Sequence, residues 1–145
     1  MSSFKEILFW IWQFPQNILG LILLLFYKHE KLYLSINGRH FYSTSEMPSG
    51  ISLGNYIILN RMDDGVDMKH EYGHSVQSRH WGLLYLFVIG LPSACGNLWD
   101  RWFHKKWKYS DRDRWYYNLP WEKGADKNGG VNREAYIENL KKLGY

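Results

Sequence analysis

The sequence is poor in cysteine: Cys95 is the only one among its 145 residues. An internal disulfide is therefore excluded, and so is a zinc cluster built on cysteines. A metal ion bound by this chain has to be held by His, Asp or Glu side chains. The sequence also lacks internal repeats and low-complexity linkers, and its length leaves room for one domain of ordinary size.

A large excess of charge of either sign is missing as well. Eighteen Lys and Arg residues stand against fourteen Asp and Glu residues, and 46% of the chain is hydrophobic. A disordered chain would combine low hydrophobicity with high net charge, so we expect a folded protein. The mean hydropathy of −0.43 is too polar for a protein made mostly of membrane spans. Any apolar segment must therefore accompany a sizeable water-facing part.

A long apolar segment is present near the N-terminus. The twenty-one residues from Ile7 to Tyr27 carry no formal charge, which is enough to cross the roughly 30 Å of bilayer hydrocarbon. We expect residues 1–28 to form an uncleaved membrane anchor, followed by one domain over residues 29–145. A kinked span, or two short interfacial pieces, are alternatives because four residues in the middle of the segment are polar or break helices: Gln13, Pro15, Gln16 and Asn17.

A second apolar segment covers residues 81–98, of which the strongly apolar part, residues 81–91, is short for a membrane span. A re-entrant, an interfacial or a buried core segment are the alternatives here. Basic residues are more numerous after the first apolar segment than before it, which weakly predicts a cytoplasmic position for the larger part of the chain.

The remaining pattern predicts an α+β fold. Asn37-Gly38 separates two β-rich stretches, residues 31–36 and 39–43, and is typical of a tight hairpin. In Ile51 to Asn60, alternating apolar residues predict a third strand with Ile51, Leu53, Ile57 and Leu59 on one face, so we expect a small antiparallel sheet. Helix signals predict three helices, over residues 66–81, 119–128 and 132–143.

The helix predicted for residues 66–81 contains His70-Glu71-Tyr72-Gly73-His74, an HExxH motif. Residues four apart lie on one face of a helix, so His70 and His74 can bind one metal ion. Glu71 can face the same cavity and accept a proton from a water molecule that zinc makes more acidic. Gly73 weakens a helix, and we expect it to have a packing role such as close approach of another element.

Two residues compete as the third metal ligand. His80 stands six residues after His74, but Gln77 occupies the position where a glycine would turn the chain back toward the metal. If the helix continues through Gln77, His80 points away from His74. The second candidate is Glu122, which lies four residues before Asp126 on a predicted short helix. One of these carboxylates can bind zinc while the other orients a histidine.

His70-Glu71-x-x-His74 followed by Glu122-x-x-x-Asp126 resembles the gluzincin class of zinc metallopeptidases. The stretches HEYGHSVQS, GLLYLFVIGLPS and WEKGADKNGGV also resemble a small group of poorly characterised bacterial membrane-associated metallopeptidases. The resemblance implies a minimal zincin-like domain in which one Zn²⁺ per chain is bound by His70, His74 and Glu122. It also implies that Glu71 is the general base and that Asp126 supports a histidine ligand.

The same resemblance implies that the strand over residues 51–60 is an edge with which an extended peptide pairs, through Gly54, Tyr56 and Ile57. The residue that stabilises the negatively charged oxygen of the reaction is left open among four candidates: Tyr116, Tyr117, Tyr136 and Arg133.

These features together lead to the hypothesis of a zinc-dependent metallopeptidase associated with the bacterial cell membrane, with its catalytic part on the cytoplasmic side. The expected partners are a peptide or protein substrate and the lipid bilayer. Nucleic acid is not expected, because the basic and aromatic segment over residues 99–117 fits a membrane interface better. The alternative is a non-enzymatic membrane protein with a structural or degenerate zinc site. The sequence sets neither the substrate nor the oligomeric state.

Overall fold

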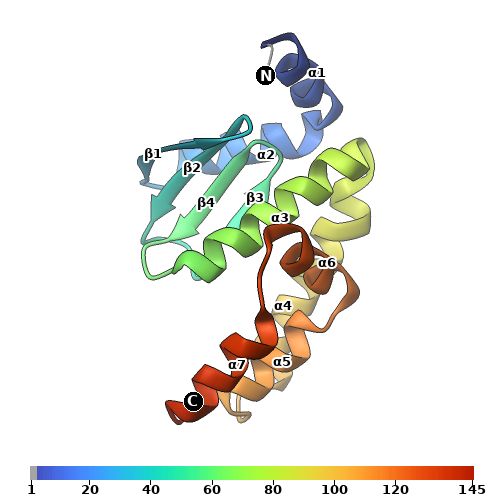
Figure 1. Cartoon of the computed structure of the whole chain (residues 1–145). Helices are drawn as coiled ribbons and strands as arrows, with labels where there is room; N and C mark the ends of the chain where they lie inside the picture. The colour runs from blue at the N-terminus through green and yellow to red at the C-terminus, as the bar shows by residue number, and fades with distance from the viewer. Residues whose placement is uncertain (1–2) are drawn as a thin grey trace.

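A computed structural model of the chain describes residues 3–145 and confirms the α+β class, with a small four-stranded sheet and several helices (Figure 1). The sheet, α2 and α3 form one half of the molecule, and α4 to α7 extend from it toward the C-terminus. The elements are α1 (Ser3–Trp12), α2 (Phe14–Phe26), β1 (Glu30–Ile36), β2 (Arg39–Thr44), β3 (Ile51–Leu53), β4 (Tyr56–Asn60), α3 (Gly65–Trp81), the 3-10 turn η1 (Gly82–Leu84), the π-helical turn η2 (Leu86–Gly90), α4 (Leu91–Phe103), α5 (Tyr109–Tyr117), α6 (Pro120–Gly129) and α7 (Arg133–Lys142).

The hairpin expected at Asn37-Gly38 is present. β1 and β2 pair in antiparallel fashion, and the two turn residues have φ angles of 49° and 74°. Positive φ at both central positions is the geometry of the type I′ turn, which Asn and Gly tolerate best. This part of the sheet follows from local sequence alone.

The single strand expected over residues 51–60 is wrong. Gly54, with a φ angle of 65°, and Asn55 form a second tight turn that divides the segment into β3 and β4. β4 inserts between β2 and β3, in the sheet order β1-β2-β4-β3, and runs parallel to β2. The sheet is therefore mixed instead of antiparallel.

The turn also corrects which side chains share a face. Ile51 pairs with Ile58 across the β3–β4 hairpin, and paired residues point to the same side of a sheet. Ile51 and Leu53 consequently lie on the opposite face from Ile57 and Leu59. A two-residue turn keeps the even spacing of the apolar residues but reverses their facing, and for this reason the sequence pattern imitates one strand.

Helices cover both faces of the sheet. Phe41, Ile57 and Leu59 are buried and pack with Met68 and Tyr72 of α3 on one face. On the other face, α2 approaches so closely that a Cβ atom added to Gly20 would lie 3.0 Å from the Tyr56 side chain. The sheet thereby fixes the position of α3, which carries the HExxH motif.

α3 begins at a strong N-cap. The Asp64 carboxylate accepts hydrogen bonds from the backbone N–H groups of Val66 and Asp67, and Asp67 accepts one from the Asp64 backbone N–H. This reciprocal capping box satisfies donors that a helix start leaves free. The helix then continues without a break past Gln77 to Trp81.

The N-terminal apolar segment is not one continuous helix. α1 and α2 meet at 90° near Gln13, and no single helix in residues 3–145 is both long and apolar enough to cross a bilayer, although the bent pair has the necessary length and composition. The polar residues of the segment are buried against the body of the protein: Gln16 donates to the Ser78 hydroxyl and the Gly82 carbonyl, and Asn17 accepts from the Asn55 backbone. This arrangement fits both alternatives to one straight span, a kinked span and two short pieces.

The second apolar segment runs along the surface as η1, η2 and the start of α4. Tyr85 and Ile89 are buried, whereas Phe87 is 72% exposed and Leu91 is 59% exposed. One side of this segment therefore packs on the protein and the other side does not.

α3 and α6 pack with their backbones in contact at Gly73. A Cβ atom placed on Gly73 would lie 1.8 Å from the carbonyl oxygen of Ala125, and one placed on Gly129 would lie 2.0 Å from the carbonyl oxygen of Lys69. The expected packing role of Gly73 is thus confirmed: glycines and an alanine at the crossing let the two helices meet.

We expect Gly73→Ala to lower the free energy of unfolding by about 2 kcal/mol, because the new methyl group has to push α6 away. The better helix propensity of alanine, about 1 kcal/mol, does not offset this clash. Urea unfolding followed by circular dichroism measures the change. Gly65→Ala is the matched control on the same helix, since nothing lies within 4 Å of a Cβ atom there. Equal stability of the two variants would contradict the close packing.

A buried carboxyl on α5 makes stability depend on pH. Asp113 is 8% exposed, and burial raises its pKa to about 6 although the charge of Arg133 opposes the shift. The unfolded carboxyl ionises near its usual pKa of about 4, so the folded protein loses stability as the pH rises from 4 to 6. Asp113→Asn should therefore be more stable than wild type by about 3 kcal/mol at pH 8. Urea unfolding of wild type and variant at pH 8 and at pH 4 checks this. A stability difference between them that persists at pH 4 would contradict it.

Candidate metal centre

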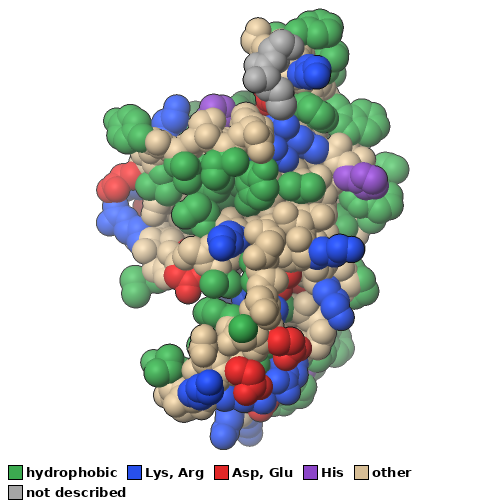
Figure 2. All heavy atoms as spheres, in the orientation of Figure 1, with side chains coloured by type: hydrophobic (Ala, Val, Ile, Leu, Met, Phe, Trp, Pro, Cys, Tyr) green, Lys and Arg blue, Asp and Glu red, His purple; other side chains and the backbone are tan. Residues whose placement is uncertain are grey.

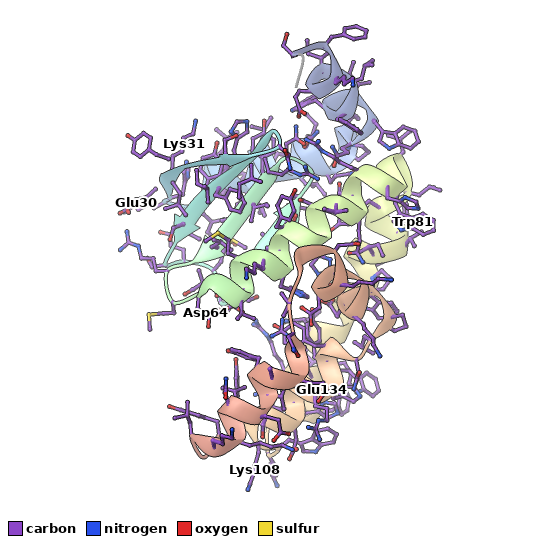
Figure 3. The ribbon with its side chains drawn as sticks, viewed as in Figure 1. Glu30, Lys31, Asp64, Trp81, Lys108 and Glu134 are labelled. Carbon is purple, nitrogen blue, oxygen red and sulfur yellow. The ribbon has the colours of Figure 1, made fainter. Side chains whose placement is uncertain are left out.

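Two histidines of α3 and one glutamate of α6 meet in the interior of the protein. Nε2 of His70 and Nε2 of His74 each lie 3.0 Å from Oε2 of Glu122. All three side chains are buried, and Glu122 is fully so. Figure 3 shows α3 between its labelled ends, Asp64 and Trp81, with α6 packed across its middle. The helix crossing at Gly73 is what brings Glu122 to both imidazoles.

The three side chains form a possible metal-binding site. Their candidate ligand atoms all lie within 4.8 Å of one another. A tetrahedral zinc ion with bonds of about 2.0–2.1 Å holds neighbouring ligand atoms about 3.3 Å apart, close to the separations found here. Two imidazoles and one carboxylate suit several divalent transition metals, zinc among them, so the ligand set by itself does not identify the metal.

His70 is oriented by a chain of charged groups. Its Nδ1 lies 2.7 Å from Oδ1 of Asp126, and Arg133 donates two hydrogen bonds of 2.9 Å to the same carboxylate. The Arg133 guanidinium also stacks 3.5 Å from the centre of the Tyr117 ring, which touches His70 edge-on. With Nδ1–H donating to Asp126, loss of the proton from Nε2 would leave its lone pair directed at the centre, as a metal ligand requires.

His74 has a corresponding partner in Gln77. Nδ1 of His74 lies 2.8 Å from Oε1 of Gln77, whose amide nitrogen donates to the carbonyl of Trp121 at the start of α6. Gln77 thereby orients His74 and joins the two helices that supply the ligands. The sequence offered one signal for this role, the position of Gln77 one turn after His74.

The second carboxylate oxygen of Glu122, Oε1, is fixed by a hydrogen bond. The Tyr116 hydroxyl donates to Oε1 of Glu122 at 3.0 Å and lies 3.1 Å from the Ser93 hydroxyl. Oε2 of Glu122 is left to face the two histidines. Tyr116, Ser93 and Arg133 come from different elements, α5, α4 and α7, and no periodic spacing links them to the motif.

The surroundings of the centre favour positive charge. Burial alone would lower the pKa of His70, but hydrogen bonds to Asp126 and Glu122 and the charge of Glu71 raise it to about 9. Burial would raise the pKa of Glu122, but hydrogen bonds from the two histidines outweigh it and hold that pKa well below its usual range. A divalent cation at this position takes the place of bound protons.

Glu71 lies beside the centre in an open cleft of about 450 Å³. Its side chain reaches Gly50, where an added Cβ atom would lie 3.1 Å from Cγ of Glu71. Oε2 of Glu71 is buried and has no hydrogen-bond partner among residues 3–145. Burial raises the pKa of Glu71, although the charges of His74 and His70 oppose the shift. A carboxylate with a raised pKa and a free oxygen can accept a proton in a cleft.

The cleft does not involve the strand residues expected to bind substrate. Gly54 packs against Asn17 of α2, Tyr56 faces α2, and Ile57 is fully buried under α3. β4, which carries Tyr56 and Ile57, is also an interior strand. The cleft is lined instead by the loop before β3 and β3 itself, residues 47–53, on one side and by η2 and α4 on the other.

The structure brings some of the remaining candidate residues to the site and leaves others away from it. His80 is exposed at the end of α3 against Trp81, so the structure does not bring it to His70 and His74. Tyr116 and Tyr117 line the cleft, whereas Arg133 is engaged by Asp126 and Tyr136 lies outside the cleft lining.

Among protein-family models, curated proteins and solved structures, none matches this chain. The class that the fold and the site define is an α+β protein with a buried His-His-Glu cluster able to hold a metal ion.

Gln77→Ala should weaken zinc binding about tenfold while leaving the fold intact, because His74 loses the partner that fixes its orientation. Competition with a zinc-binding dye measures the affinity. Lys69→Ala is the control on the same helix, since this side chain is exposed and adjoins His70 without contacting the centre. Identical affinities in the two variants would mean that Gln77 does not position His74.

Proposed function

We propose that this chain is a membrane-associated zinc-dependent metallopeptidase that hydrolyses peptide bonds. The observation that carries the proposal is the meeting of His70, His74 and Glu122 at 3.0 Å, beside a cleft that Glu71 lines. A structural zinc site is closed, whereas a catalytic one adjoins space for a substrate and a group that moves protons. The cleft therefore favours catalysis over the alternative of a purely structural zinc site.

The ligands for zinc would be His70, His74 and Glu122, and the ion would supply Lewis-acid chemistry that makes water more acidic and polarises a carbonyl group. Glu71 accepts the proton of the attacking water and passes it to the departing amine. Asp126 and Gln77 hold the two imidazoles in the tautomer and orientation that a metal requires. In this proposal Tyr116 and Tyr117, which line the cleft, are the remaining candidates to stabilise the negatively charged oxygen.

β3 is the element that best suits an extended peptide. It is the last strand in the sheet order and lines the cleft next to Glu71. A peptide that pairs with the outer edge of Ile51–Leu53 would lie along the wall of the cleft that faces the metal centre. In this proposal, backbone hydrogen bonds to β3 bind the peptide, and the shape of the cleft determines which side chains of the peptide are accepted.

We further propose that the bilayer is a partner and the bacterial cell membrane is the location, with the catalytic part on the cytoplasmic side. The proposal does not include nucleic acid. The first experiment incubates the zinc-loaded protein with a mixed peptide library and identifies cleavage by mass spectrometry. Cleavage should disappear when a chelator removes zinc and return when zinc is added. Zinc-loaded protein that cleaves no peptide, or cleavage that survives complete zinc removal, would contradict the proposal.

A further inference from the structure

α1 exposes the side that a water-soluble protein would bury. Phe4, Ile7, Leu8 and Ile11 follow the spacing of one helix face, and each is more than half exposed. The helix docks on the body through its other side, where Glu6 forms an ion pair of 2.8 Å with Arg79. An amphipathic helix that turns its apolar stripe outward needs an apolar environment on that side.

η1, η2 and α4 form a second outward stripe. Its residues recur at helical spacing over nearly five turns, interrupted by no charged residue from Trp81 to Trp99. They are Leu84, Phe87, Val88, Leu91, Leu98, Trp99 and Trp102, all exposed, with the exposed Cys95 on the same side.

The two stripes are joined at the corner between α1 and η1. Trp12 packs against Gly82, where an added Cβ atom would lie 2.0 Å from Cε2 of the indole ring, and its Nε1 donates to the carbonyl of Arg79. In Figure 2, hydrophobic side chains gather over α1 and along the adjoining margin of the molecule. We call these two stripes together the apolar face. Contiguous exposed apolar patches mark sites of interaction with membranes or other proteins.

Charge at the border of the apolar face indicates what covers it. Lys105, Lys106 and Lys108 follow α4 directly and are exposed, and Lys5 lies on α1. Figure 3 shows the labelled Lys108 at the end of the molecule remote from α1. Tryptophans at the edge of an apolar surface, with lysines beyond them, suit the boundary between acyl chains and anionic lipid headgroups. A second copy of this chain would bring the same positive charges together.

The contacts of α2 oppose a complete crossing of the bilayer. Gln13, Gln16 and Asn17 are fully buried, and each forms a hydrogen bond with the body of the protein, while the Oε1 atoms of Gln13 and Gln16 have no partner among the described residues. Pulling α1 and α2 into one straight span would expose these amides to hydrocarbon, where an unpaired polar group is costly.

We propose that the apolar face inserts into one leaflet of an anionic bilayer, with α1 and α4 lying along the surface and no segment of residues 3–145 crossing it. η2 and α4 also provide a wall of the metal-centre cleft through Leu86, Gly90, Ala94 and Asn97. Because a helix is about 10 Å thick, the cleft lies next to the lipid headgroups. Resting on the proposed function, this placement assigns as substrates the polypeptide segments that leave or lie along the membrane surface.

The single native cysteine allows a direct test. Cys95 is labelled with an environment-sensitive fluorophore, and the full chain is mixed with vesicles of phosphatidylcholine alone or with 30% phosphatidylglycerol, on the order of the anionic content that attracts basic segments. We expect a blue-shifted emission, quenching by lipids that carry a quencher on the acyl chain, and stronger binding to the anionic vesicles. Phe87→Gln combined with Leu91→Gln should weaken vesicle binding at least tenfold.

The control carries the label on α7, in the double variant Cys95→Ser with Asn139→Cys, where the side chain is exposed among charged residues. This label should neither shift nor be quenched. The proposal would be overturned if the Cys95 emission did not change with vesicles, or if the labels at both positions were quenched equally. It would also be overturned if the Cys95 label were protected in an oligomer of the chain that persists with vesicles. The readout needs neither metal nor activity, so its failure is distinct from failure of the metallopeptidase proposal.

Discussion

Glu71→Gln is expected to lower peptide hydrolysis by about 10²- to 10⁴-fold while the protein keeps its zinc. The amide has nearly the same size as the carboxylate but cannot accept a proton. Oε2 of Glu71 has no other partner among the described residues, so the substitution disrupts no hydrogen bond from this atom. Initial rates on a peptide identified from the library, together with zinc content, measure both effects.

Glu134→Gln is the matched control for this experiment, because Glu134 is exposed on α7 and remote from the cleft. It should retain the wild-type rate. If Glu71→Gln kept zinc and full activity, Glu71 would not be the general base and the mechanism would be wrong.

The second large effect is expected from Glu122→Ala, which should weaken zinc binding by more than about 100-fold. Loss of a group that only orients a ligand has a smaller effect, about 10- to 100-fold. Glu122 is the one ligand supplied by α6, and its Oε2 contacts both histidines. Glu122→Gln preserves the volume of the fully buried side chain and removes its charge, so it separates loss of the ligand from disturbed packing. Elemental analysis after dialysis gives zinc per chain, and circular dichroism checks the fold.

His80→Ala is the control for the ligand assignment. It should bind zinc as wild type does, because His80 is exposed at the end of α3. Zinc content unaffected by Glu122→Ala but lost in His80→Ala would reverse the assignment of the third ligand.

The centre was largely predictable because its information is local and periodic. Spacings of four residues on two helices placed His70 with His74 and Glu122 with Asp126, and the structure brings the two pairs together. The absence of a glycine at Gln77 disfavoured His80, and the resemblance to gluzincins implied Glu122 as the third ligand. Gly73 indicated close approach of another element, and this element is α6.

The groups that support the ligands were not predictable to the same degree. Arg133 follows the glycine turn after α6, and its pairing with Asp126 depends on how α7 leaves that turn. Tyr116 and Ser93 reach Glu122 from elements whose relative positions only the tertiary structure fixes. Sequence spacing carries no information on such contacts.

The errors in the fold have physical causes. Across Gly54-Asn55 the spacing of the apolar residues stays even, so a hairpin imitates a strand, and the parallel pairing of β2 with β4 depends on an insertion that no local signal indicates. In the N-terminal segment, the absence of charge concealed that Gln16 and Asn17 are partners of the body of the protein.

X-ray absorption at the zinc edge of the zinc-reconstituted chain reports the ligands of the metal directly. We expect one zinc per chain with two imidazole nitrogens and carboxylate or water oxygen at about 2.0–2.2 Å, and no sulfur. Absence of bound zinc, or a zinc ion with three imidazoles or with sulfur from Cys95, would contradict a centre built from His70, His74 and Glu122.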